Sequence, residues 1–291
     1  MMNFLYGELT EPPKDFSPPE TWPEYGLLAE PLGFCARESV GSAPMGVRWS
    51  AWPLTFEEYV SDREPDVEES KKGTLARNRW VTWKRISRAD IPPGWRIGPK
   101  KPWRIDGFHT LSSGDYTGIW HKNARREARL WRERHLDVTH RIEQASFEEF
   151  KRAYLMSSTL KKTGMDMLSI LERKYALGAR EYIELWVVRD IKHTLIVAGT
   201  AVINSPSAKS SVRFCPFMLP AARETFASTG LVDYWFELSQ QRGVRYQVFT
   251  CFWQPGDPKG WKGPAEFKSH FGLKYVAYPP LLYRFVRGKV F

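Results

Sequence analysis

The chain has 291 residues, of which 42% are hydrophobic and 14% aromatic, which is enough for one large domain or two, with a substantial core. No apolar stretch approaches the roughly 20 residues that cross a bilayer, and the first residues lack the basic start and apolar middle of a signal peptide. The three cysteines, Cys35, Cys215 and Cys251, are widely spaced and form no C-x-x-C pair, so we expect neither a zinc site nor a disulfide framework, and a reduced, cytoplasmic setting.

Positive charge is concentrated in the middle of the chain, whose formal net charge is +10. Segment 71–141 has 18 lysines and arginines against 6 acidic residues, whereas segment 1–70 has 4 against 14. Six tryptophans are interleaved with the basic residues of the middle segment. Such a segment can bind a polyanion, because cations attract phosphates and aromatic rings stack on bases. The alternative is a solvated basic face over tryptophans that belong to the core.

The N-terminal part of the chain predicts few regular elements. Residues 1–70 are rich in proline and acidic residues, which disfavours long helices. Residues 55–59 are expected to open a short helix, with Thr55 as N-cap and Glu58 three positions later. Weak alternation predicts a strand over residues 79–86. We therefore expect residues 1–112 to form an irregular α/β unit.

Residues 115–135 have the spacing of an amphipathic helix with a basic face. Lys122, Arg125, Arg126 and Arg129 form a stripe, while alanines and tryptophans fall near a different face. Arginine forks match phosphate oxygens, so these four side chains are candidates for binding the phosphates of a substrate. The alternative is a solvated helix face with salt bridges to its own acidic residues.

From residue 146 onward the pattern changes to well-defined helices and strands. Ser146 and Glu149 form a capping box that predicts the start of a helix. A mostly antiparallel sheet is expected, with a helix that crosses between two of its strands. The expected elements are helices over 146–158 and 164–178, strands over 182–188, 194–203 and 211–218, a helix over 231–241, a strand over 246–252, a short helix over 263–272 and a last strand within 275–286.

The short helix near the C-terminus is clearly delimited. Pro264 suits a first helical turn, and Gly272 suits the position just past the last one. Phe267 and Phe271 are four residues apart, so they share a face and can anchor the helix to a core. Lys268 follows one anchor directly, so its position is better defined than that of a free surface lysine. The alternative is an exposed lysine on a helix.

The order of these elements is that of the GNAT acyltransferase fold, and within that superfamily the sequence resembles the Fem-type (FemABX-like) aminoacyltransferases. Segment 122–129, with its paired arginines, is similar to the helix that enters the second domain in that family. Segment 147–164, an aromatic helix followed by Lys-Lys-Thr-Gly, is similar to its next segment, and 267–272 is similar to its F-K-x-x-F-G close. The resemblance implies an α+β fold, with a GNAT-like acyltransferase domain over 113–291 and a degenerate GNAT-like half over 1–112.

Fem-type enzymes extend peptidoglycan bridge peptides with amino acids from aminoacyl-tRNA. The resemblance therefore implies an aminoacyltransferase of cell-wall synthesis whose partners are aminoacyl-tRNA and a nucleotide-linked or lipid-linked peptide acceptor. In such a reaction an amine attacks an ester carbonyl, and the enzyme positions both groups and stabilises the developing oxyanion. The lysine of the family motif lies near the reacting end of the donor, which implies catalytic roles for Lys268 and Phe267.

Further candidates flank this helix. Trp253, Trp261 and Lys262 can form a wall on which a terminal adenosine stacks, although core packing of the tryptophans is the alternative. Asp233 and His270 are alternatives for accepting the proton of the attacking amine, which needs no dedicated base if the bound amine has a low pKa. The histidines show no ligand-type spacing, so no metal is expected.

Residues 220–230, before the crossing helix, disfavour acetyl-CoA. GNAT enzymes that use it bind its pyrophosphate with a Q/R-x-x-G-x-G/A turn, whereas this segment has one glycine and no such pattern. We therefore expect no cofactor. Two alternatives to the aminoacyltransferase remain, an N-acyltransferase with acyl-CoA as co-substrate and a non-catalytic, basic nucleic-acid-binding protein on the same scaffold.

Overall fold

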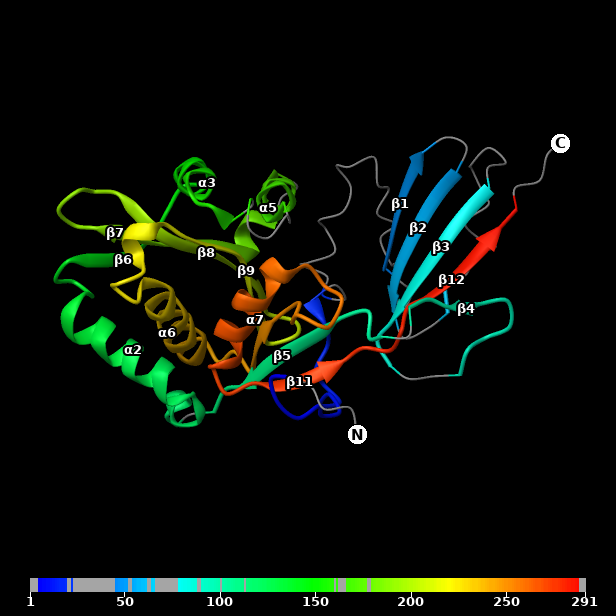
Figure 1. Ribbon diagram of the computed structural model, residues 1–291, viewed down its shortest axis with the longest axis horizontal. Coiled ribbons are helices and arrows are strands. Elements are labelled where there is room, and N and C mark those ends of the chain that lie inside the picture. Colours follow the sequence, from blue (N-terminus) through cyan, green and yellow to red (C-terminus); the bar gives the residue numbers. More distant parts are fainter. Residues whose placement is uncertain are drawn as a thin grey trace.

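Two β-sheets organise the molecule, a seven-stranded sheet covered by helices and a five-stranded sheet, which lie on the left and right of Figure 1. The structure is a computed structural model. It describes residues 5–19, 22, 45–51, 54–61, 64–65, 78–87, 90–99, 101–112, 114–159, 161, 166–176 and 179–287. Cys35 and the predicted helix start at 164–165 lie outside these residues.

The seven-stranded sheet has the order β11-β5-β10-β9-β8-β7-β6. All neighbours are antiparallel except β9 and β10, which are parallel because a helix crosses between them. The mixed, mostly antiparallel α+β class predicted from the sequence is thereby confirmed. The strands are β5 (Ile105–Thr110), β6 (His140–Gln144), β7 (Ile183–Asp190), β8 (Ile196–Ser205), β9 (Ser210–Met218), β10 (Tyr246–Phe249) and β11 (Lys274–Ala277).

Helices cover both faces of this sheet (Figure 1). Alternate residues of β7 show why, since Leu185 and Val187 pack into one core and Trp186 and Val188 into the other. The first core takes α3 (Phe147–Met156) and α5 (Met167–Ala176), and the second takes α2 (Lys122–Arg134) and α6 (Ala227–Gln241).

The helices predicted for the second half are confirmed, with shifted ends, and so are its predicted strands up to the one over 246–252. The capping box between Ser146 and Glu149 starts α3. The helix expected over 115–135 begins only at Lys122, because Asp115 caps a separate 3-10 turn, η4 (Tyr116–Ile119). Strand β6, which the sequence analysis missed, pairs with β7 at the sheet edge.

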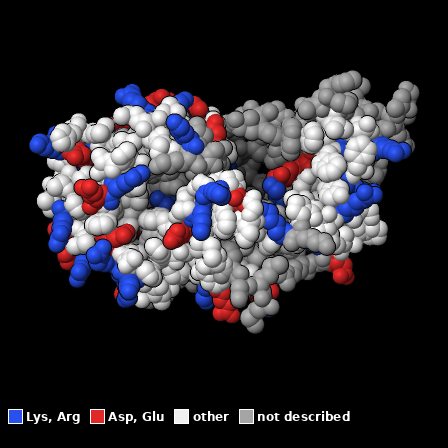
Figure 2. Space-filling view, viewed as in Figure 1, with Lys and Arg blue, Asp and Glu red and all other residues white. Residues whose placement is uncertain are grey.

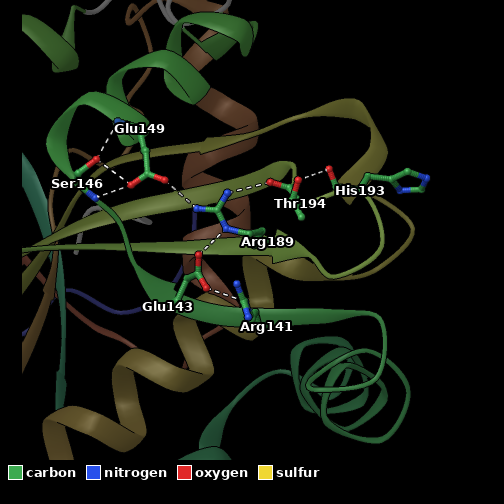
Figure 3. A network of polar contacts seen from close by, with 7 residues as sticks. All are labelled: Arg141, Glu143, Ser146, Glu149, Arg189, His193 and Thr194. Carbon is green, nitrogen blue, oxygen red and sulfur yellow. Dashed lines mark hydrogen bonds and ion pairs between the residues drawn. The ribbon is translucent and has the colours of Figure 1, made fainter.

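A polar network fastens α3 to that edge (Figure 3). Arg189 on β7 donates to the carboxylates of Glu143 on β6 and Glu149 on α3, the latter at 3.1 Å. It also donates to the carbonyl oxygen of Thr194 in the β7–β8 turn at 2.8 Å. One guanidinium therefore joins strand β6, helix α3 and the β7–β8 turn.

The five-stranded sheet has the order β1-β2-β3-β12-β4 and a small core of Val81, Trp83, Trp95 and Leu282. The strand predicted over 79–86 is confirmed as β3. The strands are β1 (Met45–Ala51), β2 (Leu54–Ser61), β3 (Asn78–Arg85), β4 (Arg96–Ile97) and β12 (Leu282–Val286).

The short helix predicted over 55–59 is wrong, because these residues belong to β2. β2 pairs with β1 on one side and with β3 on the other, and the buried Glu57 forms an ion pair with Arg79 of β3 at 3.3 Å. Pairing across the sheet overrides the local capping pattern, and the β-branched and aromatic residues of the segment suit a strand.

The two sheets exchange strands across the boundary expected at residues 112–113. β5 precedes this boundary but pairs with β10 and β11, while β12 follows it but pairs with β3 and β4. The apolar run over 275–286 is therefore two strands in different sheets, separated at Pro279 and Pro280, which have no N–H for a ladder. The division into two folding units stays a prediction.

Four of the six tryptophans in the basic middle segment are buried, as the core alternative expects. Trp83 and Trp95 lie in the core of the five-stranded sheet, whereas Trp131 on α2 and Trp120 just before α2 lie in the core between that helix and the seven-stranded sheet. Trp80 is partly exposed and stacks on Tyr283 with ring centroids 4.9 Å apart.

Candidate active site

A cavity of about 540 Å³ lies where strands β9 and β10 separate. The two strands pair in parallel over only three positions, of which the last joins Val248 to Val212. β9 then continues to Met218, whereas β10 ends at Phe249. Residues of both diverging ends line the cavity, together with residues of α7 (Lys262–Ser269).

An irregularity in β9 accompanies this separation. The register between β8 and β9 shifts between Gly199 and Ala201, where Cys215 and Pro216 add an extra residue to β9. Cys215 has a φ of +46°, and Pro216 has no N–H to donate to a ladder. A bulge of this kind bends a strand, and here it occurs where β9 no longer accompanies β10.

Most of the cavity wall is apolar, including Phe217, Phe249, Trp261 and Phe267. Its lining also includes four charged residues. Arg223 is exposed, whereas Glu127 on α2, Arg213 on β9 and Lys268 on α7 are partly buried.

Lys268 is held at the end of β10. Its Nζ donates to the carbonyl oxygens of Thr250 at 2.6 Å and Cys251 at 3.0 Å, and it lies 4.6 Å from the ring centroid of Phe252. The side chain is half-buried rather than exposed. An ammonium has three N–H donors, so these two bonds leave one donor for a ligand in the cavity.

The surroundings of Lys268 favour loss of its proton. Burial lowers the pKa of Lys268 from 10.5 to about 8, and the nearby charge of Arg213 adds to the lowering. Cys251 and Asp106 raise the pKa of the lysine but do not offset the burial. At pH 7 the ammonium form still predominates, because the pH is below this pKa.

The helix that carries Lys268 has the predicted form. α7 spans Lys262–Ser269, and Gly272 just beyond it has a φ of +63°, which suits glycine. Phe271 is fully buried and Phe267 is half-buried, with their ring centroids 5.1 Å apart. Phe267 therefore anchors the helix and also lines the cavity.

The sequence analysis missed Arg213, which lies on β9 and lines the cavity. Its guanidinium carbon is 5.6 Å from the ring centroid of Phe267, and its Nε is buried without a hydrogen-bond acceptor among the described residues. Burial lowers the pKa of Arg213 from 12.5 to about 10. A signal was present in the sequence, because Arg213 interrupts the apolar run from Val212 to Met218.

The basic stripe of α2 does not reach the cavity lining. Lys122, Arg125, Arg126 and Arg129 are all exposed, and Figure 2 shows basic side chains over α2 with acidic ones between them. Arg129 makes a loose ion pair with Glu133 at 3.9 Å. The residue of α2 that lines the cavity is Glu127, whose carboxylate accepts a hydrogen bond from Thr229 Oγ1 at 2.7 Å.

The three residues predicted to form one stacking wall lie in different places. Trp261 lines the cavity, but Trp253 and Lys262 do not. Trp253 donates from its ring nitrogen to the carbonyl oxygen of Asp257 at 3.1 Å, and Lys262 Nζ lies 5.7 Å from the Trp253 ring centroid. These two side chains therefore stabilise the loop before α7.

Neither suggested proton acceptor lines the cavity. Asp233 is buried between α2 and α6, where it accepts two hydrogen bonds of 2.6 Å from Arg132. Tyr116 donates to the same carboxylate at 3.1 Å. His270 stacks on His121 with ring centroids 4.8 Å apart, and its backbone carbonyl accepts from the backbone N–H of His121.

The N-terminus of α6 also borders the cavity, through Ser228 and Thr229. Phe226 precedes the helix with a left-handed φ of +59°, and no side chain caps this end. Within the described ranges, no three His, Cys, Asp or Glu side chains are grouped so as to hold a metal ion. Of the helices in these ranges, none is both long and apolar enough to cross a membrane.

No family model and no curated protein matches the sequence. Solved structures do resemble it. The structure titled "Crystal structure of FemX" superposes with a TM-score of 0.69 at 10% identity, covering 92% of this chain and 94% of that one. The L-PGS structure from Bacillus licheniformis has a TM-score of 0.53 at 14% identity, covering 83% and 81%.

A tandem GNAT protein from the clavulanic acid biosynthesis pathway has a TM-score of 0.50 at 7% identity, covering 85% of this chain and 80% of that one. At such identities the likeness shows the fold. The chain therefore has the Fem-like GNAT fold that the sequence motifs indicate. Because it covers 92% of this chain, the FemX superposition also extends beyond residues 113–291.

Proposed function

Given the Fem-like GNAT fold, we propose that the protein is an acyltransferase that moves an amino acid from aminoacyl-tRNA to an amine, with a cell-wall peptide precursor as the acceptor class. The observation that carries the proposal is the position of Lys268. Its ammonium is fixed by two carbonyl oxygens at the wall of an apolar cavity, and one of its N–H donors remains for a ligand.

In the proposed reaction the amine nitrogen attacks the ester carbonyl, and negative charge develops on the carbonyl oxygen. The third N–H of Lys268 stabilises that charge, most effectively where the apolar wall excludes water. The C–O bond of the ester then breaks, and the proton lost by the nitrogen ends on the departing ribose hydroxyl. The protein positions both reactants, and no covalent enzyme intermediate is needed.

The wall of the cavity suits a reacting end that carries a base and an ester. Phe267 and Trp261 offer aromatic surface to an adenosine, and Trp261 is the member of the predicted stacking wall that borders the cavity. Lys122, Arg125, Arg126 and Arg129 are proposed to bind phosphates farther along the tRNA or on a nucleotide-linked acceptor, because they are exposed and clustered on one helix.

A transfer assay tests this proposal. Total tRNA charged with radiolabelled amino acids is mixed with a nucleotide-linked peptide precursor, and label in acid-soluble product is measured. We expect Lys268→Ala to reduce transfer about 10²- to 10³-fold, the usual effect of removing one oxyanion donor. Lys262→Ala removes an exposed lysine from the same helix and should leave transfer within twofold. Equal activity of the two variants would refute the role of Lys268.

The uncapped N-terminus of α6 favours one second candidate, an N-acyltransferase that uses acyl-CoA. Helix N-termini attract phosphate, and this one borders the cavity through Ser228 and Thr229. Thermal unfolding distinguishes the donors, since protection by charged tRNA but not by acetyl-CoA is expected for the aminoacyltransferase. The reverse pattern would replace it with the second candidate.

A further inference from the structure

Among the residues that the structure describes, the guanidinium of Arg213 has no acidic partner, unlike the guanidinium groups of the buried Arg79 and Arg104. Arg79 pairs with Glu57 at 3.3 Å, and Arg104 pairs with Asp106 at 2.7 Å. For Arg213, by contrast, no side-chain hydrogen bond or ion pair with the described residues is found, and its Nε is buried without an acceptor.

Burial of an unpaired charge is costly, so a protein that keeps one usually completes it with a ligand or loses stability. Arg213 points along the wall of the cavity, with the ring of Phe267 5.6 Å from its guanidinium carbon. Phe267 is the neighbour of Lys268 in α7. The unpaired arginine therefore lies beside the proposed reaction centre.

The acidic residue that lines the same cavity does not neutralise it. Glu127 accepts from Thr229 Oγ1 at 2.7 Å, and it forms no ion pair with Arg213. Arg213 and Lys268 instead repel each other, since the charge of the arginine lowers the pKa of the lysine. The part of the cavity wall around Phe267 thus has two cations and an aromatic ring.

We infer that Arg213 is a substrate-binding residue that takes an oxyanion group, a carboxylate or a phosphate, of the molecule bound next to Lys268. A guanidinium presents paired N–H donors in a plane, which match the two oxygens of either group. The inference rests on the proposal that this cavity holds the reacting groups, and it adds that one of them is anionic close to the transferred acyl group.

Anion binding can be measured without turnover. The thermal midpoint of the whole chain is followed during titration with sodium phosphate, with sodium acetate, and with sodium chloride at matched ionic strength. We expect a saturable stabilisation by phosphate or acetate beyond that of chloride. Phosphate alone would indicate a phosphate group of the substrate, and acetate alone would indicate a carboxylate.

Two variants give matched comparisons. Arg213→Gln should lower the affinity for the stabilising anion at least tenfold. Arg223→Gln removes an exposed arginine that lines the same cavity and should change the affinity for the anion less than threefold. Arg213→Lys keeps the charge but not the planar fork of the guanidinium. Its affinity for the anion should lie between that of Arg213→Gln and that of the unchanged protein.

The unfolding temperatures of the same variants test whether Arg213 has a merely structural role. Without added anion, Arg213→Gln should unfold at the same temperature as the unchanged chain or higher, because a partly buried cation with no acidic partner among the described residues has been removed. A lower midpoint together with unchanged anion binding would overturn the inference, as would the absence of any anion effect on the unchanged protein. Equal loss in both glutamine variants would also overturn it.

The anion titration and the transfer assay test different residues, so either can fail without the other. If Lys268→Ala retains both transfer and anion binding, the proposed oxyanion role fails while the inference for Arg213 stands. If transfer depends on Lys268 but the anion effect is insensitive to Arg213, the proposed function stands and the inference for Arg213 fails.

Discussion

Lys268 donates a hydrogen bond of 2.6 Å to the carbonyl oxygen of Thr250, the residue that follows the end of strand β10. The contact joins α7 to the point where β10 has separated from β9. The lysine is thus placed by a feature of the sheet and not only by its own helix.

The protonation of Lys268 predicts a fall of activity at alkaline pH. Burial lowers its pKa to about 8, so the oxyanion donor is lost as the pH rises through that value. The acceptor amine must be neutral to attack, so kcat/KM should first rise with pH and then fall near pH 8. In Lys268→Arg, whose guanidinium stays protonated, the falling limb should disappear. A falling limb that persists in this variant would contradict the assignment.

The lowered pKa of Lys268 also predicts that the stability of the fold rises at alkaline pH, where activity falls. The folded state holds the Lys268 proton less tightly than the unfolded state, so between about pH 8 and 10.5 the unfolded chain binds more protons. The contribution of this residue to the free energy of unfolding therefore rises with pH in that window. Urea unfolding at pH 8 and pH 10 should show a smaller gain in Lys268→Met than in the unchanged protein.

The exposed arginines of α2 predict a salt-dependent interaction with RNA. If Arg125 and Arg126 contact phosphates, the double change to glutamine should reduce the slope of log K against log salt by about one to two for tRNA binding. Arg134→Gln removes an exposed charge from the last turn of the same helix and should alter the slope less. Identical slopes for all variants, measured by filter binding, would leave the stripe as a solvated face.

Gly230 is the point at which α6 approaches α2. A Cβ there would lie 2.5 Å from ring atoms of Trp131, which is fully buried. We expect Gly230→Ala to lower the free energy of unfolding by about 1–3 kcal/mol, since overpacking outweighs the gain in helix propensity. Gly263→Ala in α7 meets no atom within 4 Å and should be neutral or slightly stabilising. Urea unfolding of both variants checks this.

The pair of Asp233 and Arg132 has a structural role in the packing of α2 on α6. Asp233→Asn should lower the free energy of unfolding by about 1–3 kcal/mol, because a buried carboxylate with charged and phenolic donors is lost. Transfer activity per folded molecule should stay unchanged, since the residue does not line the cavity. Glu133→Gln breaks the exposed, 3.9 Å pair with Arg129 and should cost under about 0.5 kcal/mol.

Local patterns determined much of the second half of the chain. The capping box of α3, the delimited helix α7 and the alternation of strands β7 to β9 are each encoded within a few residues, and each is present in the structure. The family motif around Phe267 and Lys268 likewise indicates the Fem-like GNAT fold, which the superposition on FemX supports. These features follow from short-range spacing, which a single sequence displays.

What the sequence could not decide depends on residues far apart in the chain. Residues 55–59 have a local helix signal, but pairing with β1 and β3 makes them a strand. The last apolar run divides between two sheets because β5 and β3 offer separate edges. Whether a charged residue is paired or lines a cavity also depends on tertiary neighbours. Asp233, a predicted proton acceptor, instead binds Arg132, whereas Arg213, which the sequence did not single out, lines the cavity.

The sequence by itself determined that Lys268 follows a helical anchor near the end of a GNAT-like unit. The tertiary structure decided what surrounds that lysine, through the separation of β9 from β10 and the unpaired Arg213 on the facing strand. The physical reason is that helix punctuation is a local property, whereas burial and the strength of a charge interaction are set by packing among distant segments.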